Sequence, residues 1–175
     1  YQLDPVFECR RGTVGMQSIE ALVDFTWLSR PNVVGQDTLL ALDPSGQLLY
    51  CTTDGAMAAT VLIPPYDGWT GPVAIEAFQN RIYLLEPDVN EIWVYEREDK
   101  LFANPPKRYF SESVVDLSSS MDISIVQGTV FILHRDGHMT QCVRREQGAS
   151  PECSIEMRYS DGRPGRFDET RFEGL

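Results

Sequence analysis

Short apolar runs separated by turn residues dominate the chain, and helical spacing of apolar positions is almost absent. An amphipathic helix repeats apolar residues at i, i+3, i+4 and i+7 over about 11 residues or more. Only 18–27 approaches that pattern, and its end alternates like a strand. Elsewhere, β-rich runs are bounded by Pro, Gly, Asn and Asp, which favour turns. The pattern predicts an all-β chain, with strands at 38–42, 47–52, 73–78, 81–85, 91–95, 123–126, 129–133 and 139–143.

The predicted strands also form an internal repeat. The stretch 43–51 aligns without a gap with 134–142, and Glu86 opens a similar turn between them. Four short strands recurring every 43–50 residues are typical of a β-propeller blade. A further strand precedes each hairpin and a fourth run follows it, and these lie at 23–27, 73–77 and 121–125, and at 59–63, 108–110 and 153–159.

This repeat predicts a single β-propeller segment of about three four-stranded antiparallel blades. The expected blade bounds are roughly 16–70, 71–118 and 119–175, with residues 1–15 forming the last strand of a preceding blade. Three blades do not close a ring, since propellers typically have four to eight. An open stack leaves two apolar sheet faces and unpaired edges exposed. We therefore expect a fragment of a longer protein, or a half-propeller completed by a partner, rather than a self-sufficient three-sheet domain.

Four stretches carry a resemblance to a known family: 22–27, 39–46, 81–87 with 92–95, and 115–123. At the level of repeat consensus, over roughly 13–140, the chain resembles bacterial extracytoplasmic β-propeller proteins that are NHL-like and mostly uncharacterised. The resemblance implies a six-bladed propeller that serves as a surface sensor or binding scaffold, often tethered to the membrane by a preceding helix. This chain departs from the family in showing only three blades.

Charge narrows the classes of partner. Against 15 Lys and Arg stand 26 Asp and Glu, a formal net charge of −11. Phosphate backbones are bound by clustered basic residues, so nucleic acid is not an expected partner. No apolar run reaches the roughly 18 residues of a membrane helix, and no transmembrane segment is expected in this chain. The remaining expectation is a protein partner, or self-association, through exposed blade edges.

The four cysteines, Cys9, Cys51, Cys142 and Cys153, form no C-x-x-C pair, so no zinc ribbon or thioredoxin-like site is indicated. An even number fits disulfides in an oxidising compartment, and we expect an extracytoplasmic protein, secreted or at the cell surface. Of the three possible pairings, the most local joins Cys142 to Cys153 across a hairpin. The alternative is four buried free thiols in a cytosolic protein.

Three acidic residues are the candidate binding site. Asp24, Glu76 and Asp122 lie on the three predicted innermost strands, which line the central channel where propeller ligands usually bind. Converging carboxylates offer oxygen ligands to a hard cation such as calcium, or bind a polar ligand. In the alternative interpretation these acids hydrogen-bond loop N–H groups at the blade junctions and fix the register of the blades.

Two histidines and one tryptophan complete the candidates. His134 and His138 would face each other across a hairpin, where they either begin a transition-metal site or remain solvated loop residues. Trp69 lies in the turn-rich connector 64–72, where it either stacks on a ligand or packs over the next blade. We predict no catalytic residues, because no Gly-x-Ser-x-Gly elbow is present.

The sequence therefore favours a non-enzymatic binding or assembly module, a propeller scaffold that mates with further blades or subunits and needs no cofactor. The alternative is a metal-dependent hydrolase of the lactonase type. Enzymes of that type use Glu, Asn and Asp around a divalent cation. In this chain Asp24, Glu76 and Asp122 would bind calcium, but no Asn falls on a predicted innermost strand.

Overall fold

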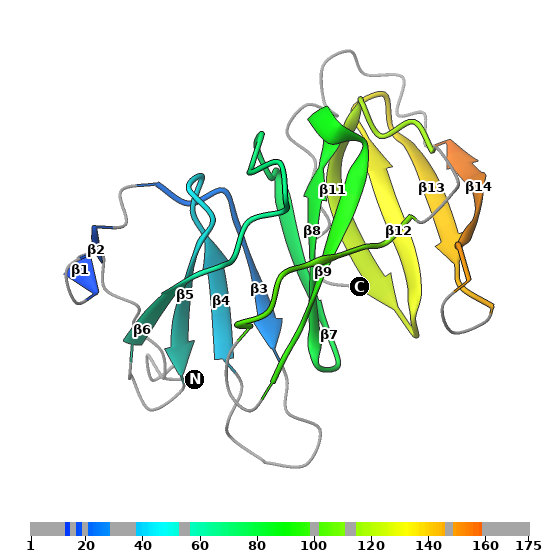
Figure 1. The fold of residues 1–175 in the computed structure, drawn as a ribbon. Helices are drawn as coiled ribbons and strands as arrows, with labels where there is room; N and C mark the ends of the chain where they lie inside the picture. The colour runs from blue at the N-terminus through cyan, green and yellow to red at the C-terminus, as the bar shows by residue number, and fades with distance from the viewer. Residues whose placement is uncertain are drawn as a thin grey trace, which may run out of the picture.

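The computed structural model describes residues 13–14, 17–18, 21–28, 38–52, 57–98, 102–110, 115–145 and 149–158 of the 175-residue chain. Regular structure in this part is β-strand, apart from one turn of 3-10 helix, η1 (Pro87–Val89). Three antiparallel sheets of four strands follow one another along the chain, after a short ribbon of β1 (Thr13–Val14) and β2 (Gln17–Ser18) (Figure 1). The chain is therefore all-β, as predicted.

In each sheet, strands adjacent in sequence are adjacent in space, as in a propeller blade. Blade 1 comprises β3 (Asp24–Leu28), β4 (Thr38–Leu42), β5 (Gln47–Thr52) and β6 (Met57–Val61). Blade 2 comprises β7 (Ala74–Phe78), β8 (Arg81–Glu86), β9 (Glu91–Glu96) and β10 (Lys107–Arg108). Blade 3 comprises β11 (Ser120–Val126), β12 (Thr129–His134), β13 (His138–Val143) and β14 (Glu152–Arg158).

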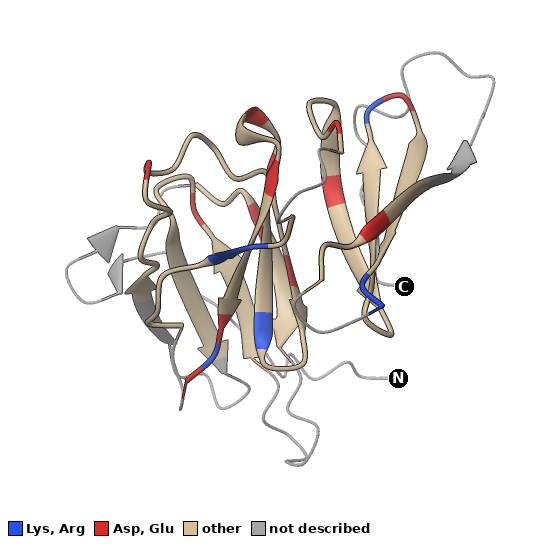
Figure 2. Cartoon of the chain, turned by 45° about the vertical axis from the view of Figure 1, so that its right-hand side comes forward, with Lys and Arg blue, Asp and Glu red and all other residues tan. Residues whose placement is uncertain are grey.

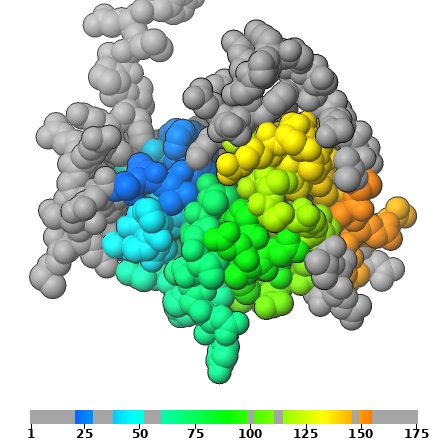
Figure 3. Space-filling view, turned by 90° about the horizontal axis from the view of Figure 1, so that it is seen from above, coloured from blue at the N-terminus to red at the C-terminus, as the bar shows by residue number. Residues whose placement is uncertain are grey.

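The first strand of each blade is its innermost strand. Strand β7 lies between β3 on one side and β11 on the other (Figure 1). Seen from above, the three blades lie side by side in chain order, from blue through green to orange (Figure 3). The sheets thus form three consecutive blades of a β-propeller segment.

Two apolar cores hold the blades together. The first, between blades 1 and 2, contains fully buried side chains such as Leu40, Leu48 and Leu84. The second, between blades 2 and 3, contains Leu85 and Ile132 with their neighbours. Burying one such side chain contributes about 1.5–3 kcal/mol. A blade covered on both faces needs no polar face, which is why β8 reads as a nearly continuous apolar run.

The observed strands overlap the predicted ones, but β6 begins and ends before the predicted 59–63, and the outer edge of blade 2 differs most. The sequence predicts a strand at 108–110, but β10 contains only Lys107 and Arg108. Tyr109 still donates its N–H to the Ile92 carbonyl at 2.9 Å. Tyr109 and Phe110 then pack into the core between blades 2 and 3, where they are 4% and 5% exposed. Burial of two aromatic rings outweighs continued strand pairing.

The expectation for residues 1–15 falls almost entirely outside the described residues, which include only Thr13 and Val14 of that range. Cys9 also lies outside them. In the described part of the chain, no helix is long and apolar enough to span a membrane.

Candidate functional site

Strand register defines which residues occupy equivalent positions on the three innermost strands. Asp24, Ala74 and Asp122 pair with Leu42, Leu85 and Leu133 of the second strands, so they form one equivalent set. Two residues further along, a second set consists of Thr26, Glu76 and Ser124. All three predicted acids therefore lie on the innermost strands, at two levels along them.

At the junction of blades 1 and 2, side chains of β3 accept hydrogen bonds from the backbone of β7. The Asp24 carboxylate accepts the Ile75 N–H at 2.9 Å. The Thr26 hydroxyl oxygen accepts the Ala77 N–H at 3.1 Å, and the same hydroxyl donates to Glu76 Oε2 at 2.8 Å. Two side chains thus take the place of the missing backbone ladder between β3 and β7.

The junction of blades 2 and 3 repeats one of these contacts and replaces the other. The Glu76 carboxylate accepts the backbone N–H of Ile125, as Thr26 accepts that of Ala77 one blade earlier. Ala74 offers no acceptor at the position of Asp24, and Asp122 instead accepts the N–H of its own neighbour, Ile123, at 2.9 Å. Each junction is therefore fixed by side-chain acceptors aimed at the next blade.

Burial makes the charged form of the Glu76 carboxyl less favourable. Desolvation raises the pKa of the Glu76 carboxyl, and the nearby Asp122 raises it further. The hydrogen bonds from Thr26, Ile125 and Ala77 lower it in part. A partly buried carboxylate tolerates this environment because backbone and hydroxyl donors compensate it.

Asp24 and Glu76 accept N–H groups at the blade junctions, but the donors belong to strands and not to loops as the alternative interpretation expects. Asp122 accepts the N–H of its own neighbour. In the part of the chain that the structure describes, no three His, Cys, Asp or Glu side chains converge as metal ligands, so Asp24, Glu76 and Asp122 do not form a calcium cage. Binding of a ligand by these three residues stays a prediction.

A third set of equivalent residues lies at the end of the second strand of each blade, or directly after it: Asp43, Glu86 and His134. All three are buried. Asp43 closes its own turn by accepting the backbone N–H groups of Ser45 and Gln47 at 2.8 and 2.9 Å. The sequence repeat aligned these three positions. It did not predict that Glu86 and His134 hold the connectors that lead into β7 and β11.

Glu86 fixes the connector that leads into β7. Its side chain is fully buried and accepts the N–H groups of Thr70 and Gly71 at 2.6 and 2.9 Å and the Thr70 hydroxyl at 2.9 Å. The indole N–H of Trp93 donates to its other oxygen at 2.6 Å. The carboxylate therefore compensates four donors at the base of the innermost strand.

His134 performs the corresponding task in blade 3. Its Nδ1 is 3.0 Å from the Ser119 hydroxyl, just before β11, and its Nε2 is 3.0 Å from the Thr140 hydroxyl. The ring stacks on His138 with centroids 3.9 Å apart. The expectation of two solvated loop histidines is wrong for His134, which is fully buried, because the connector into β11 folds over it. Burial lowers its pKa to about 4.

Trp69 packs between blades, as one of its two interpretations predicts. Its indole lies so close to Gly46 of blade 1 that an added Cβ there would come within 2.4 Å of Nε1. The ring also stacks on Tyr95 of blade 2 with centroids 6.2 Å apart. Tyr95 in turn donates its hydroxyl to the Ile63 carbonyl at 2.7 Å. Trp69 therefore holds the connector against both blades.

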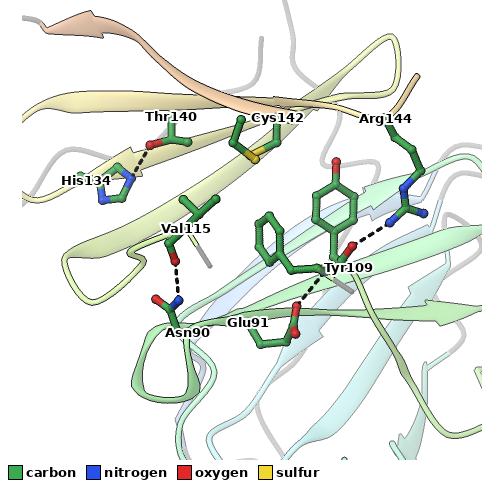
Figure 4. The surroundings of a disulfide bond; sticks show 10 residues. Asn90, Glu91, Tyr109, Val115, His134, Thr140, Cys142 and Arg144 are labelled. Atoms are coloured by element: carbon green, nitrogen blue, oxygen red, sulfur yellow. Dashed lines mark hydrogen bonds between the residues drawn. A yellow bond between two sulfur atoms is a disulfide. The ribbon is translucent and has the colours of Figure 1, made fainter. Parts of the chain in front are cut away.

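Of the three pairings left open by the sequence, the most local, Cys142–Cys153, is present and joins directly opposed residues of β13 and β14 (Figure 4). Its sulfurs lie against the core between blades 2 and 3. Nearby, Arg144 donates to the Tyr109 carbonyl at 2.8 Å, and Glu91 accepts the Phe110 N–H at 3.1 Å (Figure 4). Cys51 is also disulfide-bonded, and no described cysteine is free.

The fold and the junction contacts define a class: a segment of three consecutive β-propeller blades held together by side-chain acceptors on the innermost strands. No family model matches the chain, and no curated protein matches its sequence. Among solved structures, the chain is similar to the computationally designed Ika4 protein, at 12% identity and a TM-score of 0.46 over 83% of each chain. That likeness is too slight to support a function.

Proposed function

We propose that the chain is a non-enzymatic assembly module, a propeller scaffold of the cell surface or extracellular space that mates with a protein partner through the open faces of its end blades. The observation that carries the proposal is the exposure of Phe25 and Trp27 on β3, at 61% and 48%. Large apolar side chains grouped on one strand face are typical of a protein interface.

The charge distribution supports a protein partner over a polyanion. Acidic residues lie on strands and turns of all three blades, and basic residues are fewer (Figure 2). The disulfide between Cys142 and Cys153 supports an oxidising, extracytoplasmic location. The carboxylates of Asp24 and Glu76 are engaged by strand N–H groups, which supports an architectural rather than a catalytic use.

Hydroxyl-radical footprinting of the protein in its native extract tests this proposal, because radicals oxidise aromatic side chains in proportion to their exposure. Tyr66, whose side chain is fully exposed, is the internal control. We expect strong oxidation of Tyr66 and protection of Phe25 and Trp27 until the sample is diluted or dissociated. Oxidation of Phe25 and Trp27 in the extract to the extent seen in the isolated chain would contradict the proposal.

A further inference from the structure

A cavity of about 350 Å³ lies at the end of blade 2, where the turn between β7 and β8 meets the end of β9. Two short segments line it, residues 79–81 and residues 96–98. The Arg97 N–H donates to the Asn80 carbonyl at 2.8 Å, which continues the β8–β9 pairing one step beyond Arg81 and Glu96. A backbone hydrogen bond therefore holds the two walls of the cavity together.

The lining of this cavity is entirely polar or charged. It consists of Gln79, Asn80, Arg81, Glu96, Arg97 and Glu98. Ligand sites of about 300–1,000 Å³ are lined mostly by apolar and aromatic side chains, so this cavity suits a small and strongly hydrophilic ligand. Its two arginines and two glutamates balance in charge, whereas the whole chain carries a net charge of −11. Acidic and basic residues alternate where β9 ends (Figure 2). A lining with both signs of charge favours a ligand that also carries both.

The internal repeat shows that a blade does not require these charges. Arg81 is equivalent to Thr38 of blade 1 and Thr129 of blade 3, and Glu96 is equivalent to Thr52 of blade 1. The Arg81 and Glu96 side chains are 42% and 40% exposed, and a salt bridge with that exposure adds little stability. The pair is therefore neither a feature of the repeat nor a major source of stability, which points to recognition.

Glu96 orients the Arg81 guanidinium. One oxygen of Glu96 lies 3.0 Å from Arg81 Nη2, and the other accepts a hydrogen bond from Lys107 Nζ at 2.6 Å. The Lys107 ammonium and, after it, the Arg81 guanidinium lower the pKa of the Glu96 carboxyl, which stays charged at neutral pH. A guanidinium has five N–H donors in a planar fork, so Arg81 can contact Glu96 and donate to a bound carboxylate as well.

We infer that this cavity binds a free α-amino acid with a neutral polar side chain, its carboxylate at Arg81 and Arg97 and its ammonium at Glu98. Such a molecule is small, hydrophilic and zwitterionic at neutral pH, as the volume and the balanced charges of the lining require. The two amide side chains of the lining supply donors and acceptors for the ligand's side chain. The inference goes beyond the assembly function and is independent of it, because Phe25 and Trp27 lie on β3 and not in this cavity.

Calorimetric titration of the full chain with L-glutamine tests the inference, with acetate and methylammonium as probes that each carry a single charge. We expect saturable binding of one L-glutamine per chain. Acetate and methylammonium should each bind at least about ten-fold more weakly, because each makes only part of the charge-assisted contacts. Absence of saturable binding of L-glutamine up to about 10 mM, or equal binding of all three probes, would overturn the inference.

Two variants of the lining locate the bound ligand. Arg81→Gln and Glu98→Gln each remove one charge at a position that is at least partly exposed, and each should weaken L-glutamine binding at least about ten-fold. Arg145→Gln is the matched control, since Arg145 is also an exposed arginine in an ion pair, 2.9 Å from Glu152, but lies between β13 and β14. It should bind L-glutamine as the wild type does. Circular dichroism checks that the variants are folded, and wild-type affinity in a folded Arg81→Gln or Glu98→Gln chain would overturn the inference.

Discussion

Polar residues at repeat positions have the same place in each blade but different partners. Asp43, Glu86 and His134 lie at the end of a second strand or directly after it, and each closes or anchors a loop by different chemistry. The sequence alignment predicted that the three positions correspond. It could not predict the partners, because Thr70 and Ser119 reach Glu86 and His134 only after the connectors fold over the blade.

Gly46 tests the packing of Trp69 at the scale of one residue. Both Gly46 and Gly68 have positive φ, +80° and +83°, but only Gly46 faces an indole, while nothing lies within 4 Å of a Cβ added at Gly68. Gly46→Ala should therefore destabilise the chain by about 1–3 kcal/mol more than Gly68→Ala, because overpacking adds to the shared backbone strain. Urea unfolding measures the difference, and equal losses would contradict the contact.

His134 should make the protein less stable in mild acid. Its pKa is about 4 when folded, against an ordinary value near 6.5, so the unfolded chain binds the proton more readily. Stability is then complete above about pH 6.5 and falls as the pH drops towards 4, by about 2 kcal/mol at pH 5. The raised pKa of Glu76 and Glu91 acts in the opposite direction.

Comparison with His134→Gln isolates this contribution, since the carboxyls are common to both proteins. We expect the wild-type chain to lose about 2 kcal/mol more than the variant between pH 7 and pH 5. Parallel pH profiles of unfolding free energy would show that His134 is not the residue responsible.

At the scale of elements, apolar periodicity and turn residues were sufficient to predict most strands, because each blade is a meander whose strands pair with their neighbours in sequence. The prediction was wrong where tertiary packing overrides strand propensity, at Tyr109 and Phe110, which enter the inter-blade core. The sequence alone could not decide between the alternatives for the junction contacts, since Asp24 and Ile75 are 51 residues apart.

Thr26→Val tests how the junction joins β3 to β7. The substitution keeps the side-chain shape but removes the hydroxyl that accepts the Ala77 N–H and donates to Glu76. We expect a loss of about 1–3 kcal/mol of unfolding free energy, because a buried donor and a carboxylate lose their partner. Amide exchange at Ala77 should accelerate. Thr129→Val, at a half-buried threonine that begins β12, is the matched control, and an equal effect there would contradict the assignment.

The disulfide should stabilise the edge of blade 3. Replacing Cys142 and Cys153 together by Ala removes a cross-link between residues 11 apart and should cost about 3 kcal/mol. The paired substitution is preferable to a reducing agent, because Cys51 is disulfide-bonded too. Thermal unfolding of the variant measures the loss. A melting temperature equal to that of the wild type would mean that β13–β14 pairing alone secures this edge.

At the scale of the whole molecule, the repeat period predicted about three four-stranded sheets following one another along the chain, and the structure contains three such sheets in its described part. The repeat period does not predict which blade faces are covered. The strand register does, because it shows that Phe25 is exposed at a position where Ile75 and Ile123 are buried. The internal repeat thereby identifies the face of β3 as one that the equivalent strands keep buried.

The most direct test of the assembly function is the mass of the native particle, measured by native mass spectrometry on protein from its own source, together with the intact mass of the chain. We expect a complex that contains this chain and at least one further subunit. A stable, folded particle with the mass of one chain would contradict it, since the face of β3 would then have no partner.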